Sequence, residues 1–326
     1  MAKTKEIQRR IKSVNSTKKI TKAMEMVAAS KMRKAVDAVL KTRTYANLSW
    51  ITILNISKSV GAGKYLHPLM EKRSEIKKVA IILMSSNRGL CGSFNSAIIN
   101  KAVKSIRKHQ EKNGQKKIET DFVIVGKKGL TVNSRYGYGV VAEFAKADIA
   151  AEVREVMPIA KLVIDDFLQG KYDKVMVAYT DFISAINQVP SVKQLLPIDI
   201  EAQDDYLGIM GKDTRVGADK DYYQEKEDKY LKDKDKKRFF VFSYEPGPKQ
   251  VLDEMLPRLI EVQLFQALLE SNASEHSARV AAMQKASESA TELVDQLTLY
   301  YNKARQAAIT NEIAEISAGA NALNNN

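Results

Sequence analysis

The sequence predicts an α/β protein in which a long antiparallel coiled coil of the N- and C-terminal helices joins a small Rossmann-like α/β domain. Residues 250–318 contain no glycine and a single proline, Pro257, and an apolar seam runs along them. The first 60 residues also repeat at helical spacing, and the middle of the chain alternates strand-like and helix-like segments. We expect six segments: an N-terminal coiled-coil helix (1–61), an α/β globular domain (76–200), a charged insertion (201–238), a return strand and turn (239–248), a C-terminal coiled-coil helix (249–318) and a tail (319–326).

The N-terminal helix is expected from Thr4 to about Val60, ahead of Gly61-Ala62-Gly63. Its apolar residues recur at helical spacing but change phase near Ser16–Lys18, as a coiled-coil stutter would: Ile7, Ile11, Val14, then Ile20, Met24, Val27, then Met32, Ala35, Val39. Residues 1–43 hold 13 Lys or Arg against 3 Asp or Glu. This charge fits a solvated helix face or a mitochondrial presequence, and the sharper interpretation is a basic rod that faces an acidic partner.

The middle of the chain predicts a βαβ arrangement. Val79–Met84 is continuously apolar, as a buried parallel strand is, and two further strands are expected at Asp121–Val125 and Lys174–Tyr179. A weaker strand is expected at Val140–Phe144. Helices are expected at Phe94–Gln110 and Ala151–Gln169.

The sequence offers no catalytic, cofactor-binding or metal-binding set. Gly89-x-x-Gly92 after the first strand is the candidate phosphate cradle, but it lacks the G-x-G-x-x-G spacing, so a tight strand-to-helix turn is the better account. His67, His109 and His276 are far apart in sequence, and His276 on a helical seam favours a packed or interface histidine. The single cysteine, Cys91, suits a reducing compartment. No apolar run approaches the roughly 20 residues of a membrane span, and we find no secretory signal core.

Beyond the α/β region, residues 201–238 are rich in Asp, Lys, Glu and Tyr, which predicts a segment on the surface of the protein. A strand at Arg238–Tyr244 is expected to return the chain to the α/β domain. In the C-terminal helix the seam alternates steps of three and four: Val280, Met283, Ser287, Ala290, Val294, Leu297, Tyr301, Ala304, Ala308. Residues 251–326 hold 5 basic and 10 acidic residues, so this rod should attract the basic one. The extreme C-terminus, from Ile309 on, is apolar with small residues.

Several motifs carry a resemblance that covers nearly the whole chain. The stretches Ile20–Arg33, Ala273–Met283 and Tyr301–Glu312 resemble the terminal signatures of the gamma subunit of F-type ATP synthases. The central Asn87–Asn95 and Gln188-Val-Pro190 match that family as well. The resemblance fails chiefly at Glu201–Lys237, which looks like an insertion.

The resemblance implies a central rotor that is not itself an enzyme and needs no cofactor. In the family, ion-driven rotation of the c-ring turns this subunit inside three alpha and three beta subunits, and ATP is made on the beta subunits. It also implies contact with epsilon, and a peripheral position on the cytoplasmic face of the bacterial plasma membrane, because no transit extension precedes the first helix. By the family's motifs, Lys22 and Met24 would face an acidic beta-subunit loop, and Arg305, Gln306 and Thr310 would contact a catch loop.

Two other classes stay open on the residues alone. A nucleic-acid-binding coiled coil would explain the net charge of +13, but the acidic C-terminal helix and the lack of an aromatic stacking platform weigh against it. A nucleotide-dependent enzyme would explain the α/β domain but not the missing fingerprint. The insertion is either a tolerated surface loop or a regulatory arm that touches epsilon or the ring.

Overall fold

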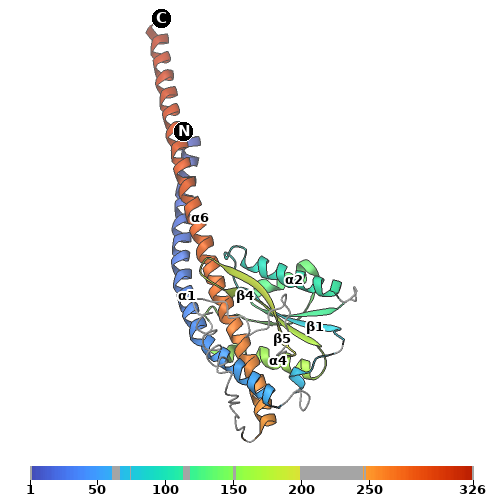
Figure 1. Ribbon diagram of the computed structural model, residues 1–326. Coiled ribbons are helices and arrows are strands. Elements are labelled where there is room, and N and C mark those ends of the chain that lie inside the picture. The colour runs from blue at the N-terminus through green and yellow to red at the C-terminus, as the bar shows by residue number, and fades with distance from the viewer. Residues whose placement is uncertain are drawn as a thin grey trace. The chain divides into compact units, whose positions relative to one another are not determined.

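The computed structural model describes residues 2–60, 67–73, 75–112, 118–149, 152–198, 245 and 247–324 (Figure 1). The expected insertion and the expected strand at Arg238–Tyr244 lie outside these residues. The described chain forms two compact units. The coiled-coil unit combines the residues up to Ala29 with those from Arg279 onward, and the α/β unit is Ser30–Ala278. Both long helices, α1 (Ala2–Val60) and α6 (Pro248–Asn324), therefore contribute to both units.

A five-stranded sheet in the order β3-β2-β1-β4-β5 forms the centre of the α/β unit. Its strands are β1 (Lys78–Met84), β2 (Glu119–Val125), β3 (Gly139–Phe144), β4 (Lys174–Phe182) and β5 (Gln188–Leu196). The first four are parallel to one another, and β5 pairs antiparallel with β4. The predicted α/β class with two long terminal helices is confirmed.

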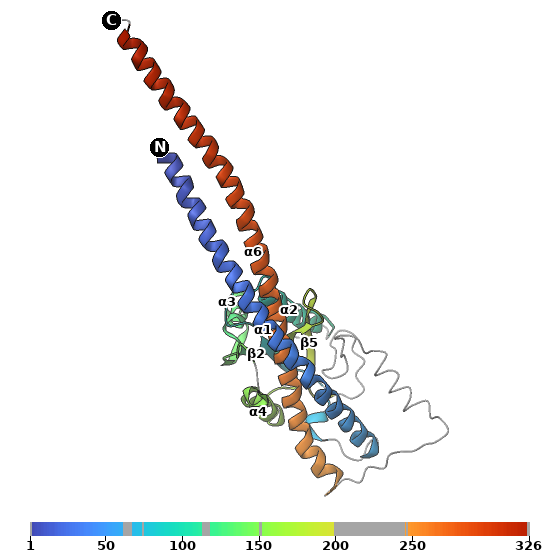
Figure 2. The same cartoon turned by 90° about the vertical axis from the view of Figure 1, so that its left-hand side faces the viewer.

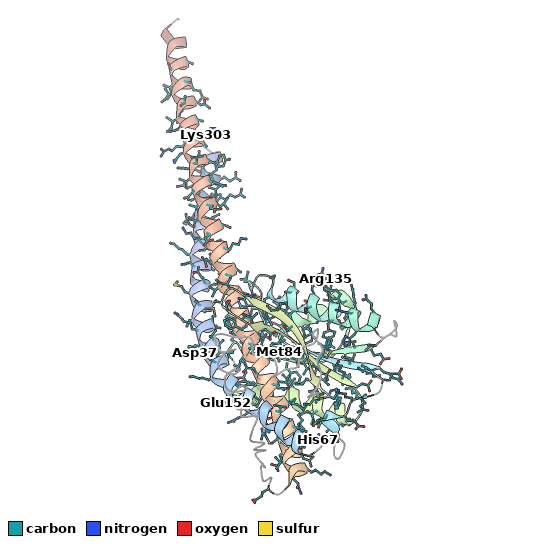
Figure 3. The ribbon with its side chains drawn as sticks, viewed as in Figure 1. Asp37, His67, Met84, Arg135, Glu152 and Lys303 are labelled. Atoms are coloured by element: carbon teal, nitrogen blue, oxygen red, sulfur yellow. The ribbon has the colours of Figure 1, made fainter. Side chains whose placement is uncertain are left out.

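Both faces of the sheet are covered, which explains the unbroken apolar run of β1. Val79, Ile81 and Leu83 pack on the side of α2 (Phe94–Lys112). The alternate residues, among them Met84, join a larger core with α4 (Met157–Leu168) and parts of α1 and α6 (Figure 3). Successive side chains of a strand point to opposite faces, so a strand buried on both faces has no polar positions.

The α/β unit also contains elements that the sequence did not predict. These are β5, the short helix α3 (Thr131–Tyr136) and three 3₁₀ turns, η1 (Pro68–Met70), η2 (Lys127–Leu130) and η3 (Val153–Glu155). Pro190 lies within β5, and this is tolerated because β5 is an edge strand that needs hydrogen bonds on one side only.

The helix expected at Ala151–Gln169 is shorter than predicted. The 3₁₀ turn η3 precedes it, and α4 begins at Met157, with Pro158 in its first turn. Proline has no N–H to donate, so it is suited to the start of a helix and not to its interior.

In the coiled-coil unit, α1 and α6 lie side by side and antiparallel, with the two chain termini at the same end (Figures 1 and 2). Thr21 and Ser287 meet across the pair, and the Ser287 hydroxyl also faces the carbonyl of Lys18. The predicted seam of α6 is confirmed, because each of its positions is buried or half-buried while most residues between them are exposed. Met283, Ser287 and Ala290 are the most deeply buried of these.

The predicted stutter in α1 is wrong. The half-buried or buried positions follow an unbroken heptad: Thr4, Ile7, Ile11, Val14, Lys18, Thr21, Glu25, Ala28. Ile20 and Val27, which the prediction placed on the seam, are 58% and 57% exposed. The middle of the seam is polar, at Lys18, Thr21 and Glu25, whereas Ile20 and Val27 beside it are apolar. The apolar residues alone therefore gave the pattern of a shifted heptad.

The C-terminal helix is longer than predicted. It continues to Asn324, through most of the segment expected to be a tail. Alanine at 318, 320 and 322 favours helix and offsets Gly319.

Candidate partner-contact surfaces

The outer side of α1 in the coiled-coil unit carries apolar side chains with no cover from α6. Ile20, Met26 and Val27 are each more than half exposed. Lys22 lies on the same flank as Met26, with a side chain 58% exposed, and its Nζ is 2.9 Å from the Glu25 Oε1. Met24 is half-buried beside the seam, so only part of its side chain is accessible. Ile20 and Val27, two turns apart on one side of the helix, are candidates for a surface that another molecule covers.

The second candidate surface lies on α6. Arg305, Gln306 and Thr310 are all exposed, and the Thr310 hydroxyl donates to the carbonyl of Gln306 at 3.0 Å. Lys303, which projects from α6 in Figure 3, is also exposed. The register set by Thr21 and Ser287 brings the start of α1 level with about residue 306 of α6, so this group lies where the pairing ends. Figures 1 and 2 show α6 continuing past the start of α1.

The structure does not bring the two predicted groups together. Lys22 is level with about residue 286 of α6, so Arg305 lies roughly 28 Å further along the helix pair. Lys22 and Met24 thus lie at one level of the helix pair, on different sides of α1, and Arg305, Gln306 and Thr310 lie at another.

Further exposed apolar residues lie on α6: the apolar stretch expected from Ile309 on, and Leu299 and Tyr300, which were not predicted. Leu299 and Tyr300 are 70% and 61% exposed, and Ile309, Ile313 and Ile316 form a stripe at spacings of four and three along the last turns. The sequence carried a signal for them, since each is a large apolar residue outside the heptad positions. Apolar residues off a seam either face a second partner or are exposed at a cost.

The loop after β1 is filled by its own side chains. The Asn95 Oδ1 accepts from the backbone N–H of Ser86 at 3.0 Å, and its Nδ2 lies 3.2 Å from the buried Cys91 sulfur. Gly92 has a φ of 58°, which a tight turn requires. The loop is therefore a tight turn that its own side chains hold in place.

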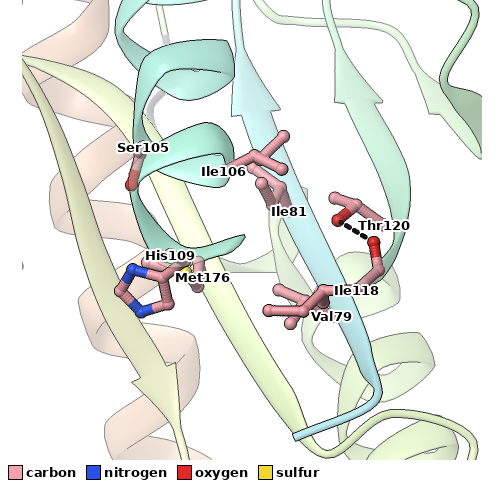
Figure 4. Close-up of a pocket in the computed structure, with 8 residues that line it drawn as sticks. All are labelled: Val79, Ile81, Ser105, Ile106, His109, Ile118, Thr120 and Met176. Carbon is pink, nitrogen blue, oxygen red and sulfur yellow. Dashed lines mark hydrogen bonds between the residues drawn. The ribbon is translucent and has the colours of Figure 1, made fainter. Parts of the chain in front are cut away.

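A small pocket lies between α2 and the beginnings of β1 and β2 (Figure 4). It is lined mostly by apolar side chains, with Ser105, His109 and Thr120 among them, and measures about 20 Å³. This is room for about one water molecule. It also lies at the wrong edge of the sheet for a nucleotide, because α/β proteins bind ligands at the carboxyl ends of their strands.

Within the described residues, His, Cys, Asp and Glu form no cluster of three or more that could hold a metal ion. None of the helices in the same part of the chain is apolar enough over a sufficient length to cross a bilayer.

Known proteins match this chain over nearly its whole length. A family model described as ATP synthase matches residues 3–323. The ATP synthase gamma chain of Legionella pneumophila is 38% identical over 323 residues, covering 99% of this chain and 100% of the relative. The gamma chain of Herpetosiphon aurantiacus is 40% identical over 330 residues, with 99% and 100% covered.

Solved structures share the fold. A chain of the Euglena gracilis mitochondrial ATP synthase, in its OSCP/F1/c-ring assembly, superposes with a TM-score of 0.61 at 16% identity, covering 99% of this chain and 95% of that one. A chain of the Tetrahymena thermophila central stalk and c-ring gives 0.54 at 24% identity, with 82% and 99% covered. Since a family model spans nearly every residue and relatives at 38–40% identity align over their full length, the chain belongs to the ATP synthase gamma chain family.

Proposed function

We propose that this chain is the central rotor shaft of an F-type ATP synthase. It couples ion-driven rotation of the membrane c-ring to conformational cycling of catalytic beta subunits, and catalyses no reaction itself. The observation that carries the proposal is the exposed apolar surface of the coiled-coil unit. A two-helix seam buries one stripe of each helix, yet Ile20, Val27, Leu299 and Tyr300 remain outside it. A surrounding sleeve of protein would cover these residues.

Apolar contacts suit a part that turns within such a sleeve. The hydrophobic effect is non-directional, so an apolar surface can pass a series of apolar neighbours without breaking specific bonds. The stripe of Ile309, Ile313 and Ile316 on the last turns of α6 is such a surface. Exposed ion pairs contribute about 0–1 kcal/mol each, so Lys22 could pass successive acidic loops at modest cost.

Partners follow from the family. We infer a ring of three alpha and three beta subunits around one copy of this chain, with epsilon and the c-ring at the membrane side. The related Euglena and Tetrahymena chains come from assemblies described by F1, a central stalk and a c-ring. Lys22 and Met24 are proposed to face the beta subunits' acidic loop, and Arg305, Gln306 and Thr310 a catch loop. The complex would be peripheral on the cytoplasmic face of a bacterial plasma membrane.

The test is purification of the native complex through a tag on this chain. We expect alpha and beta subunits to accompany it at 3:3:1 and the complex to hydrolyse ATP, while the isolated chain hydrolyses none. Ile20→Lys with Val27→Lys should weaken assembly, whereas Lys104→Glu, on an exposed position of α2, is the matched control for a changed surface charge. Retention on DNA without alpha or beta subunits, or turnover by the isolated chain, would contradict the proposal.

A further inference from the structure

One stretch of α6 is enclosed on every side. The eleven consecutive residues Ala267–Ser277 are all buried within the α/β unit, none more than 9% exposed. Consecutive residues of an α-helix point in directions about 100° apart, so eleven in a row cover its whole circumference. We call this stretch the enclosed segment. From Met283 onward the same helix buries only its seam.

The enclosed segment is polar, although enclosure usually selects apolar residues. Seven of its eleven residues are polar or charged: Glu270, Ser271, Asn272, Ser274, Glu275, His276 and Ser277. A hydrophobic surface would have buried the helix at lower cost, because a buried polar group must find a hydrogen-bond partner. What these partners are decides what the segment can do.

One group of partners is the segment Lys146–Asp148, which follows β3. The Lys146 Nζ lies 2.8 Å from the Glu275 carboxylate and 3.1 Å from the Ser271 hydroxyl. The Asn272 side chain donates to the Ala147 carbonyl at 3.3 Å, and the His276 Nε2 donates to the Asp148 carbonyl at 2.7 Å. Four side chains of α6 thus bind three consecutive residues.

This segment is itself fixed to its surroundings. The Asn87 side chain donates to the Lys146 carbonyl at 2.5 Å, which ties the segment to the loop after β1. Lys31 of α1 reaches the Asp148 carboxylate at 2.7 Å. The contacts of α6 therefore lead into the α/β unit and do not end on a free loop.

The other group of partners is the hairpin of β4 and β5. The Ser274 hydroxyl donates to the Thr180 carbonyl at 3.1 Å, and the Ser277 hydroxyl to the Ala185 carbonyl at 2.5 Å. The Gln188 side chain donates to the Ser277 hydroxyl at 3.2 Å. Four of the seven acceptors in the two groups are backbone carbonyls, whose positions are fixed by the fold.

The bonds point in three directions around the helix. At 3.6 residues per turn, Ser271 with Glu275, Asn272 with His276, and Ser274 with Ser277 form three groups roughly 100° to 150° apart. Turning the helix within its enclosure by even a fraction of a turn would break all three groups together. An apolar enclosure has no such preferred angle.

We propose that the enclosed segment is a torsional key, which locks α6 at one angle inside the α/β unit so that torque passes along the helix without slip. This inference rests on the proposed function, since a key matters only in a chain that transmits rotation. It assigns Lys146, Glu275, Ser274 and Ser277 as positioning residues for coupling.

The experiment uses the assembled complex and compares two buried serines of the enclosed segment with one buried serine outside it. Ser274→Ala with Ser277→Ala removes bonds between α6 and the hairpin. Ser85→Ala is the matched control, because Ser85 is equally buried and donates to the Gly126 carbonyl at 2.7 Å, but its bond does not involve α6. A bead attached through Lys104→Cys on α2 reports thermal angular fluctuation in the immobilised complex. Ions pumped per ATP hydrolysed are measured on membrane vesicles.

If the enclosed segment is a torsional key, the Ser274→Ala/Ser277→Ala variant should show larger angular fluctuation of the bead and fewer ions pumped per ATP. Both quantities should be unchanged in Ser85→Ala. Equal stiffness and full pumping in both would overturn it. If the serine variant does not assemble, Lys146→Met with Glu275→Met takes its place, since it removes the charged pair without leaving an unpaired charge. Failure of the unmodified complex to pump at all would instead overturn the proposed function.

Discussion

The buried ion pair between Lys146 and Glu275 gives the sharpest test of the packing around α6. Their side chains are 2% and 7% exposed, and the two charged groups are 2.8 Å apart. The Lys146 ammonium also lies 5.4 Å from the centre of the Phe94 ring. Replacing Lys146 by Met keeps most of the length of the side chain and removes its charge, which takes the Lys146 ammonium away from the Glu275 carboxylate.

The expected magnitude follows from that burial. Removing one partner of a buried pair costs about 3–5 kcal/mol, because the remaining charge is uncompensated. Replacing both partners by apolar residues of similar volume is often neutral or stabilising. We therefore expect Lys146→Met to destabilise the enclosed segment by roughly 3–5 kcal/mol. Lys146→Met with Glu275→Met should recover most of that loss.

Amide hydrogen exchange of the peptide that covers Ala267–Ser277 is the appropriate assay, since it reports local opening in a chain with two compact units. A loss of 3–5 kcal/mol corresponds to faster exchange by roughly 10² to 10⁴. Lys31→Met is the control, because the Lys31–Asp148 pair is 31% and 40% exposed and should contribute at most about 1 kcal/mol. If the single and double variants exchange alike, the pair is not coupled and the reasoning fails.

Three further outcomes are expected. Burial lowers the pKa of His67 below its usual 6.5, in keeping with its Nδ1 accepting from the Leu69 N–H. The contribution of His67 to the free energy of unfolding should thus be fully present above about pH 6.5 and be lost as the pH falls through the folded-state pKa. His67→Asn should reduce this pH dependence in acid unfolding curves. Met283→Ala should cost about 2–5 kcal/mol in thermal unfolding of the coiled coil, whereas Ser287→Ala, whose bonds are 3.4 and 3.5 Å long, should change little. Arg305→Ala should slow the assembled complex roughly tenfold if its bonds to a partner are charge-assisted, and unchanged turnover would exclude that role.

The sequence predicted well where one physical rule decides the outcome. The short, β-branched run Val79–Met84 is typical of a strand buried on both faces, and it forms most of β1. The steps of three and four from Met283 to Ala308 could only be a helical seam, and those positions are the less exposed ones. Neither result depends on what the rest of the chain does.

Prediction failed where burial depends on distant partners. Ser271–Ser277 has the composition of a solvated face, but Lys146–Asp148 and the β4–β5 hairpin, more than 85 residues away, enclose it. Pro190 and the polar residues around it concealed β5, because an edge strand does not require apolar alternation. For the contact surfaces, Lys22 and Arg305 came from family motifs, whereas Leu299 and Tyr300 could have been found as apolar residues off the seam.

The wrong phase in α1 and the polar composition of the enclosed segment have a common cause. Where the chain is to be covered by other molecules, apolar residues such as Ile20 and Val27 lie outside the seam, and polar ones such as Lys18 and Thr21 lie within it. Where α6 is held by its own chain, the polar residues face fixed carbonyls. A moving contact favours non-directional attraction, and a fixed joint favours directional bonds. The distribution of polarity along the two long helices therefore distinguishes the segment that its own chain holds from the segment that is left for partners, which periodicity alone does not show.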